Sequence, residues 1–277
     1  MGSYWALLTA FANGFVDFEA GSEAKLYSPV LISWLISFVS AISFLSLRLL
    51  GHSIRLDPAD YIYGIPIGLL LAFGNIAYLK ALASGPIGLI SAVGGISVII
   101  PVLYDTFIGK ALSLSGGSGV SMILAAVYLI AMHTNGSAIT GRIQPIVLIL
   151  ASLAAMAFGV SDIFFKLGNP SNGFGLLLLI QLVECFLFSL ILGARRIGIR
   201  MQRRHLLLIL PLGLVNMLGW LAYSAAVTKG YIDIASALAY CSPVFTLLLA
   251  HFCIGEVLSR KEMIAFCMII AGAWLVA

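Results

Sequence analysis

The sequence is short of charge. Only 9% of its 277 residues are Asp, Glu, Lys or Arg, whereas 61% are hydrophobic and the mean hydropathy is +1.11. A soluble fold needs more polar residues to cover its surface, so a soluble enzyme or binding domain is excluded. The net charge of +4 is spread thinly apart from one cluster between Arg195 and Arg204, which does not make a nucleic-acid-binding face.

The sequence also lacks the motifs of common enzyme and metal sites. It contains no H-E-x-x-H, G-x-x-x-x-G-K-[ST] or G-x-S-x-G pattern, its four histidines are scattered, and its four cysteines show no C-x-x-C spacing. We therefore expect no catalytic residue, no metal site and no cofactor. ATP is not expected to be the built-in driver of the protein's function.

Long apolar segments fill almost the whole chain. A membrane helix takes about 20 apolar residues, and the segments between polar or Gly/Pro-rich breaks have about this length. They run approximately over residues 3–20, 29–50, 60–83, 87–108, 116–133, 144–167, 173–192, 205–227, 232–254 and 261–277. The pattern predicts an all-α, multi-pass integral membrane protein with ten transmembrane helices in a lipid bilayer, which would be the inner membrane if the source is bacterial.

A repeat with a period of 145 residues divides the chain. When the sequence is shifted by 145 positions, 12 of the 32 residues from Pro66 to Ser97 are identical to those from Pro211 to Ser242. In the same register Asp17 meets Asp162. We predict two homologous five-helix repeats, 1–143 and 144–277, that together form one membrane unit. Because five is an odd number, the second repeat would be inverted relative to the first.

The basic residues give a weak indication of orientation. Ten of the fifteen lysines and arginines lie around the loops after the odd-numbered segments, five of them between Arg195 and Arg204. The positive-inside rule then places both termini outside.

The matched features resemble the drug/metabolite transporter superfamily, specifically its ten-helix EamA-type members. The resemblance rests on the Tyr-x-x-Ala pairs Tyr78/Ala81 and Tyr223/Ala226, on GVSDIFFK at 159–166, and on IGEVLSRKE at 254–262, which precedes a last helix rich in small residues. It implies a central cavity between the two halves, alternating access, and in many relatives the export of amino acids or other metabolites. Family members usually have both termini in the cytoplasm, contrary to the charge count.

Three acidic residues in apolar segments are candidates for ion or proton coupling, because a charged side chain inside a membrane helix needs a partner or a role. Asp17 and Asp162 occupy equivalent positions of the two repeats. Asp162 has a local alternative, since Lys166 lies four residues further on the same helix face, and Asp17 has the alternative of a place near the membrane surface. Glu184 lies in the middle of its segment, where it suits either proton loading and release or a structural hydrogen bond between helices.

Further polar and aromatic side chains are candidates for substrate binding together with the two aspartates. They are Asn75, Tyr78, Lys80, Asn216, Trp220 and Tyr223. Lys80 replaces an alanine of the other repeat and would suit a substrate carboxylate, with snorkelling to the interface as its alternative. The aromatic residues would form cavity walls or an interfacial belt, and the asparagines would bind substrate or join helices.

These observations predict a secondary transporter that moves a small polar or amphipathic metabolite, such as an amino acid or amine, by alternating access, with export and proton coupling. The excess of acidic candidates favours cationic or zwitterionic substrates. The alternatives are a flippase for lipids or lipid-linked metabolites and a membrane-embedded enzyme. The expected partners are the small-molecule substrate, a proton and the bilayer, without nucleic acid, and the expected assembly is a monomer or homodimer.

Overall fold

In the computed structural model, the described residues are 2–49, 56–109, 114–133, 144–168, 174–229, 239, 241–255 and 259–276. Every regular element in these ranges is helical. The elements are α1 (Gly2–Ala24), α2 (Pro29–Leu49), α3 (Pro58–Ser84), α4 (Ile87–Gly94), η1 (Gly95–Val98), α5 (Ile99–Phe107), α6 (Leu114–His133), α7 (Pro145–Leu167), α8 (Phe174–Ala194), α9 (Arg203–Lys229), α11 (Ser242–Ile254) and α12 (Arg260–Val276).

Proline and glycine set several helix boundaries. Pro58, Pro145 and Pro243 occupy the first turns of α3, α7 and α11, where the missing N–H of proline leaves no hydrogen bond unmade. Gly255 ends α11 in the left-handed conformation with φ +70°, which glycine adopts without a steric penalty. These local signals explain why most helix ends lie within a few residues of the predicted segment boundaries.

Six helical stretches in the described part of the chain are long and apolar enough to cross a membrane. They are Pro29–Leu47, Pro58–Ser84, Ile87–Tyr104, Pro145–Leu167, Phe174–Ala194 and Arg203–Thr228. Helix α1 is long enough as well, but it carries Asp17, Glu19 and Glu23. The prediction of an all-helical, multi-pass membrane protein is therefore confirmed for the described residues.

The fourth predicted segment is not one regular helix. Residues 87–107 form α4, a short 3₁₀ segment and α5 in direct succession, and the change of helix type coincides with Gly94 and Gly95. A 3₁₀ stretch inside a helix often marks a functional irregularity. Of the ninth predicted segment, the structure describes α11, Ala239 and Cys241, and the rest of that segment lies outside the described residues.

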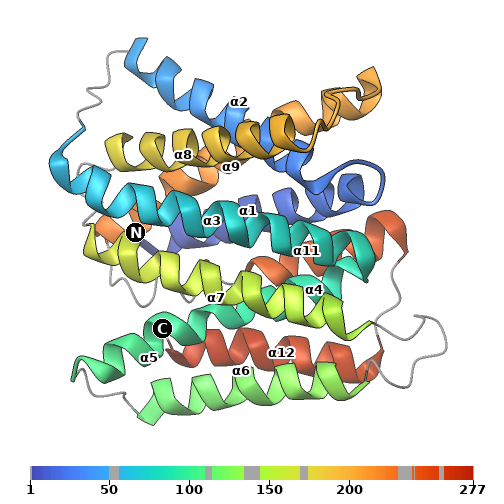
Figure 1. Cartoon of the computed structure of the whole chain (residues 1–277). Coiled ribbons are helices and arrows are strands. Elements are labelled where there is room, and N and C mark those ends of the chain that lie inside the picture. The colour runs from blue at the N-terminus through green and yellow to red at the C-terminus, as the bar shows by residue number, and fades with distance from the viewer. Residues whose placement is uncertain are drawn as a thin grey trace.

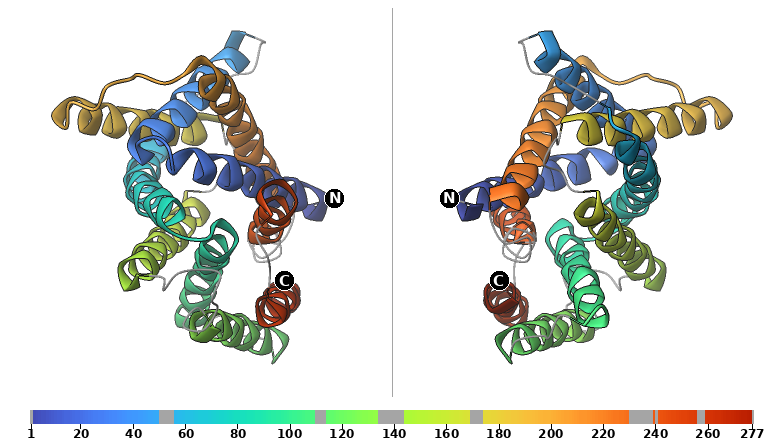
Figure 2. Two further views of the ribbon diagram at one scale, coloured as in Figure 1. Left: turned by 90° about the vertical axis from the view of Figure 1, so that its right-hand side faces the viewer. Right: turned by 90° about the vertical axis from the view of Figure 1, so that its left-hand side faces the viewer.

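The helices of the two halves are interleaved rather than side by side (Figure 1). Helix α1 packs along α9, and α7 packs along α3; α2 contacts α9, and α8 contacts α3. Helices α2 and α8 also pack against each other, as do α6 and α12. Figures 1 and 2 show α6 and α12 together at one edge of the bundle and α2 at the opposite edge.

Candidate functional site

A cavity of about 200 Å³ lies in the centre of the bundle. Its walls come from both halves of the chain, because residues of α1, α2, α3, α4 and η1 face residues of α7, α8, α9 and α11 across it. Eight of the nine residues predicted for substrate binding or coupling line the cavity: Asp17, Asn75, Tyr78, Asp162, Glu184, Asn216, Trp220 and Tyr223. Residues far apart in the sequence thus meet in one polar site.

Lys80 is the predicted residue that lies outside this lining. It follows Tyr78 by two positions, which turns its side chain about 200° around the helix axis from the tyrosine. Tyr78 is 5% exposed and faces the cavity, whereas Lys80 is exposed on the outer side of α3. This position fits the snorkelling alternative rather than a ligand for a substrate carboxylate.

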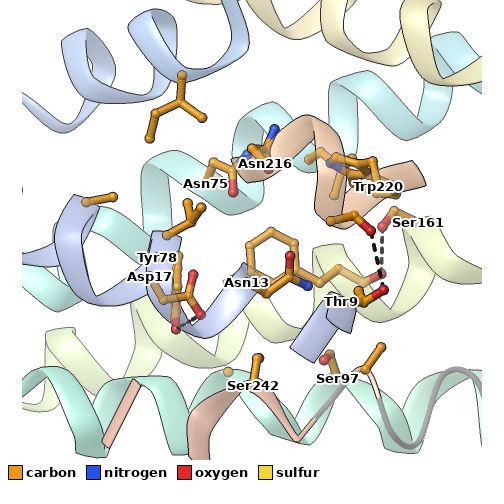
Figure 3. Close-up of a pocket in the computed structure, with 18 of the residues that line it drawn as sticks. Thr9, Asn13, Asp17, Asn75, Tyr78, Ser97, Ser161, Asn216, Trp220 and Ser242 are labelled. Atoms are coloured by element: carbon orange, nitrogen blue, oxygen red, sulfur yellow. Dashed lines mark hydrogen bonds between the residues drawn. The ribbon is translucent and has the colours of Figure 1, made fainter. Parts of the chain in front are cut away.

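Two tyrosine–aspartate pairs occupy equivalent positions of the repeat. The Tyr78 hydroxyl donates a hydrogen bond to Oδ2 of Asp17 at 3.1 Å, and the Tyr223 hydroxyl donates one to Oδ1 of Asp162 at 3.5 Å. Figure 3 shows Asp17 and Tyr78 together at one side of the cavity. The first pair joins α1 to α3, and the second joins α7 to α9. The repeat in the sequence is therefore matched by a repeated hydrogen bond in the cavity wall.

The two aspartates reach the cavity because a glycine one turn earlier allows close helix contact. A Cβ atom on Gly14 would lie 2.7 Å from the carbonyl oxygen of Ser242, and one on Gly159 would lie 2.6 Å from that of Ser97. Such distances leave no room for any side chain. Small residues at helix contacts allow backbones to approach closely in membrane proteins, and here Ser242 beside Gly14 and Ser97 beside Gly159 both line the cavity.

Glu184 belongs to a different, fully connected polar group. It is 2% exposed, and its carboxyl group accepts hydrogen bonds from Nδ2 of Asn75 at 2.7 Å, from Nε2 of Gln181 at 3.1 Å and from Oγ of Ser37 at 3.5 Å. These bonds connect α2, α3 and α8. A carboxyl group with this many donors is well satisfied despite its burial.

Asn216 extends this polar group to α9. Its Nδ2 donates to Oγ of Ser40 at 3.0 Å and to Oε1 of Gln181 at 3.3 Å, and Ser40 in turn donates to the carbonyl oxygen of Gly213 at 2.9 Å. Ser37 and Ser40 were not among the predicted site residues. Aligning the second segments of the two repeats with a shift of 144 residues would have found them, because it pairs Ser37 with Gln181 and Ser40 with Glu184.

Aromatic rings gather next to Asp162. Trp220 and Tyr223 meet edge to face with ring centroids 6.2 Å apart, and Phe165 lies 5.8 Å from the first and 5.3 Å from the second. Trp220 and Tyr223 both line the cavity. Aromatic faces attract cations, so this side of the cavity combines a carboxyl group with aromatic walls.

Some buried polar atoms of the cavity wall lack a hydrogen-bond partner among the described residues. They are Oδ2 of Asp162 and the hydroxyl groups of Ser33, Ser91 and Ser97. Ser33 is 4% exposed and Ser97 is 1% exposed. Unsatisfied buried polar groups are uncommon in native proteins and often mark functional positions. Here they leave hydrogen-bonding capacity in the cavity wall.

The cavity offers hydrogen bonding and charge rather than metal chemistry. Within the described ranges, no group of three or more His, Cys, Asp and Glu side chains is placed to hold a metal ion. The cavity lining includes three carboxyl groups and several hydroxyl and amide groups, and none of the described residues in the lining is Lys, Arg or His. This arrangement suits the binding of a cation or of a neutral polar group.

Helices of membrane-spanning length around a central cavity with polar side chains in its lining define a multi-pass integral membrane protein. Residues 145–277 match the model of the EamA-like transporter family. This confirms the resemblance predicted from the sequence. The matched family consists of membrane transporters of small solutes.

The comparison with solved structures supports the fold over the whole length. One crystal structure, described only as that of a protein, superposes with a TM-score of 0.73 over 98% of this chain and 95% of that chain, at 18% sequence identity. At this identity the likeness shows the fold alone. No curated protein matches the chain.

Proposed function

We propose that the protein is a secondary transporter that exports a small amine-bearing solute, cationic or zwitterionic, by proton-coupled alternating access. The observation that carries the proposal is the composition of the central cavity. Both halves of the chain contribute to it, three carboxyl groups line it, and none of its described lining residues is basic. A cavity of about 200 Å³ is smaller than the roughly 300–1,000 Å³ usual for drug-sized ligands, which favours a small metabolite.

The proposed architecture is ten membrane helices in two inverted five-helix repeats, 1–143 and 144–277. It is supported by the 145-residue repeat, by the corresponding packing of α1 on α9 and of α7 on α3, and by the equivalent pairs Tyr78–Asp17 and Tyr223–Asp162. Inverted repeats allow two similar conformations, open to opposite sides, to be related by the pseudo-symmetry. An experimental structure with parallel halves or with fewer spans would contradict it.

The proposed substrate class follows from the chemistry of the wall around Asp162. A substituted ammonium group in contact with Trp220 and Tyr223 would gain roughly 0.5–2 kcal/mol from the ring faces, in addition to its attraction to the carboxylate. We expect Trp220→Ala and Tyr223→Ala each to weaken the binding of a cationic amine by about threefold to thirtyfold. Lys80→Ala should leave it unchanged, because Lys80 lies outside the cavity.

Binding of matched cationic and anionic ligands to these variants, measured by thermal shift of the purified protein, tests the substrate class. Ligands that bind the folded state raise its apparent stability. If both aromatic variants retain full affinity and the lysine variant loses it, the substrate is an anion and the proposed class is wrong.

The proposed coupling groups are Asp17, Asp162 and Glu184. A carboxyl group that exchanges a proton between the two open states would couple solute export to proton entry. We expect the amide variant of at least one of the three to lose the pH dependence of transport in reconstituted vesicles, while the folded protein is retained. Wild-type pH dependence in all three variants would show that these groups are structural.

A further inference from the structure

The cavity has an aspartate at each of two sides, and the residues around the two aspartates are equivalent in the repeat. At one side Asp17 accepts a hydrogen bond from Tyr78 and is followed along the wall by Ser242; at the other side Asp162 accepts one from Tyr223 and is followed by Ser97. All three positions are related by 145 residues. Figure 3 shows Asp17 with Tyr78 on one side, Trp220 and Ser161 on the other, and Asn13 between them. A ligand in the cavity therefore meets a carboxyl group at each side.

These two carboxyl groups differ from the third in their hydrogen bonds. Glu184 accepts hydrogen bonds from three side chains that hold it against α2, α3 and α8. Asp162 accepts one long hydrogen bond, and its Oδ2 atom has no partner within the described part of the chain. Ser97, on the adjoining wall and 1% exposed, also has an unpartnered hydroxyl. An ammonium group has three N–H donors and would satisfy both atoms.

The charge of the cavity favours a ligand with more than one positive group. Besides Glu184, whose carboxyl group accepts three hydrogen bonds, two aspartates line the space, and none of the described lining residues carries a positive charge. A ligand with one ammonium group would pair with one aspartate and leave the other without a cation, so that the second aspartate would have to hold a proton. A ligand with a carboxylate at its second end would place like charges together. A ligand with a positive group at each end pairs with both.

We propose that the cavity contains two ammonium subsites, one at Asp17 and one at Asp162, and that its preferred solute is a short linear diamine that spans them. The inference rests on the proposed transport function and specifies its substrate. The cavity also suits a methylene chain, because Phe158, which packs against Tyr78, and Trp220, which packs against Tyr223, add apolar faces to its lining.

The test uses the purified full-length protein in lipid nanodiscs and measures binding by calorimetry. The ligands are the straight-chain diamines from ethylenediamine to hexamethylenediamine, the monoamines of the same chain lengths, and the corresponding ω-amino acids. We expect one diamine length to bind at least about tenfold more tightly than the monoamine of that length, and the ω-amino acid to bind more weakly than either.

Variants at each aspartate test whether the cavity has two ammonium subsites or only one. Asp17→Asn should reduce the affinity for the best diamine to about that for the monoamine, because it removes one of the two subsites. Asp162→Asn should weaken both ligands. Glu19→Gln is the matched control, since it removes a carboxyl group from the same helix as Asp17 but outside the cavity lining. The conservative variants Asp17→Glu and Asp162→Glu, with the melting temperature of each unliganded protein, show whether a loss of binding reflects misfolding.

The outcomes distinguish a failure of the two-subsite inference from a failure of the proposed transport function. If monoamines bind as tightly as diamines at every chain length and depend on Asp162 alone, the two-subsite inference is wrong and amine transport stands. If neither class of amine binds the folded wild-type protein, the proposed function itself is wrong. A diamine preference that survives both asparagine variants would place the second cation elsewhere and overturn the assignment to these aspartates.

Discussion

Glu184 has the most complete set of hydrogen bonds among the carboxyl groups of the cavity. Its three donors come from different helices. Two of them are side-chain NH₂ groups, which can donate hydrogen bonds but cannot accept them. Asn216 links the same group to α9 through Gln181 and Ser40. Buried polar networks are stable when every member is satisfied and costly when one is not. The stability of the cavity wall should therefore depend on the carboxyl group itself.

We predict that Glu184→Gln destabilises the protein by about 1–3 kcal/mol, because an amide NH₂ would face donors and leave at least one of them unsatisfied. The melting temperature in lipid nanodiscs measures the effect. Glu19→Gln serves as the control, since Glu19 is only partly buried and none of these donors contacts it. An unchanged melting temperature for Glu184→Gln would show that the network contributes little to stability.

The sequence identified cavity residues whose side-chain types are rare in membrane helices. Carboxyl groups, asparagines and tryptophan in apolar segments are conspicuous, and Asp17, Asp162, Glu184, Asn75 and Trp220 all line the cavity. Serine is common in such helices, so most cavity-lining serines could not be told from others; Ser37 is the exception, because the repeat pairs it with Gln181. Lys80 is equally conspicuous but lies outside the cavity, because its distance from Tyr78 along the helix turns it outward.

Helices α1 and α7 each make a close backbone contact with the opposite half of the chain. Gly14 and Gly159 meet the carbonyl oxygens of Ser242 and Ser97, which lie where α11 begins and where the 3₁₀ segment interrupts the fourth helix. The helices themselves were predictable from apolar segments of membrane length, and most limits agree within a few residues. The 3₁₀ interruption was not predictable, because paired glycines such as Gly94 and Gly95 also occur in continuous membrane helices.

Gly159→Ala should disturb this contact, because the added methyl group would lie 2.6 Å from a backbone oxygen that cannot move by itself. We predict a loss of about 1–3 kcal/mol of stability and a reduced transport rate in reconstituted vesicles. Gly193→Ala is the matched control, since a Cβ atom at Gly193 meets no atom within 4 Å and alanine favours the helix. Equal melting temperatures and rates for the two variants would show that the close contact is not required.

The connection between α8 and α9 carries the main charge asymmetry of the molecule. Arg195, Arg196, Arg200, Arg203 and Arg204 are all exposed there. Excess lysine and arginine favour the cytoplasmic side. Ile199, in the middle of this loop, is 62% exposed and offers a position for labelling.

We predict that Ile199→Cys, in a chain without its native cysteines, is protected from a membrane-impermeant thiol reagent in intact cells and reacts after permeabilisation. Leu56→Cys is the comparison, because Leu56 is 40% exposed and precedes α3, at a connection predicted for the other side. Reaction of Ile199→Cys in intact cells would reverse the orientation.

At the scale of the whole chain, each half supplies the packing partners of the other. Helix α1 packs on α9 and α11, α7 packs on α3, and α6 packs on α12. We predict that fragments 1–143 and 144–277 give a binding-competent protein only when they are co-expressed, because either fragment alone lacks these partners. Co-purification of the fragments, followed by ligand-induced thermal shift, measures reassembly. A single fragment that is monodisperse and protease-resistant by itself would contradict the prediction.

The interleaved packing has a consequence for biogenesis. Helix α1 leaves the ribosome first, yet one of its acidic side chains has a partner that is made much later: His205, which lies 2.9 Å from Glu23, belongs to α9. Until α9 has been inserted, Glu23 lacks this partner, whereas Asp17 meets Tyr78 as soon as α3 is in place. The membrane-insertion machinery therefore has to accommodate this first helix through most of translation. A chain that ends before α9 would keep an unpaired acidic side chain, which membrane quality control could recognise.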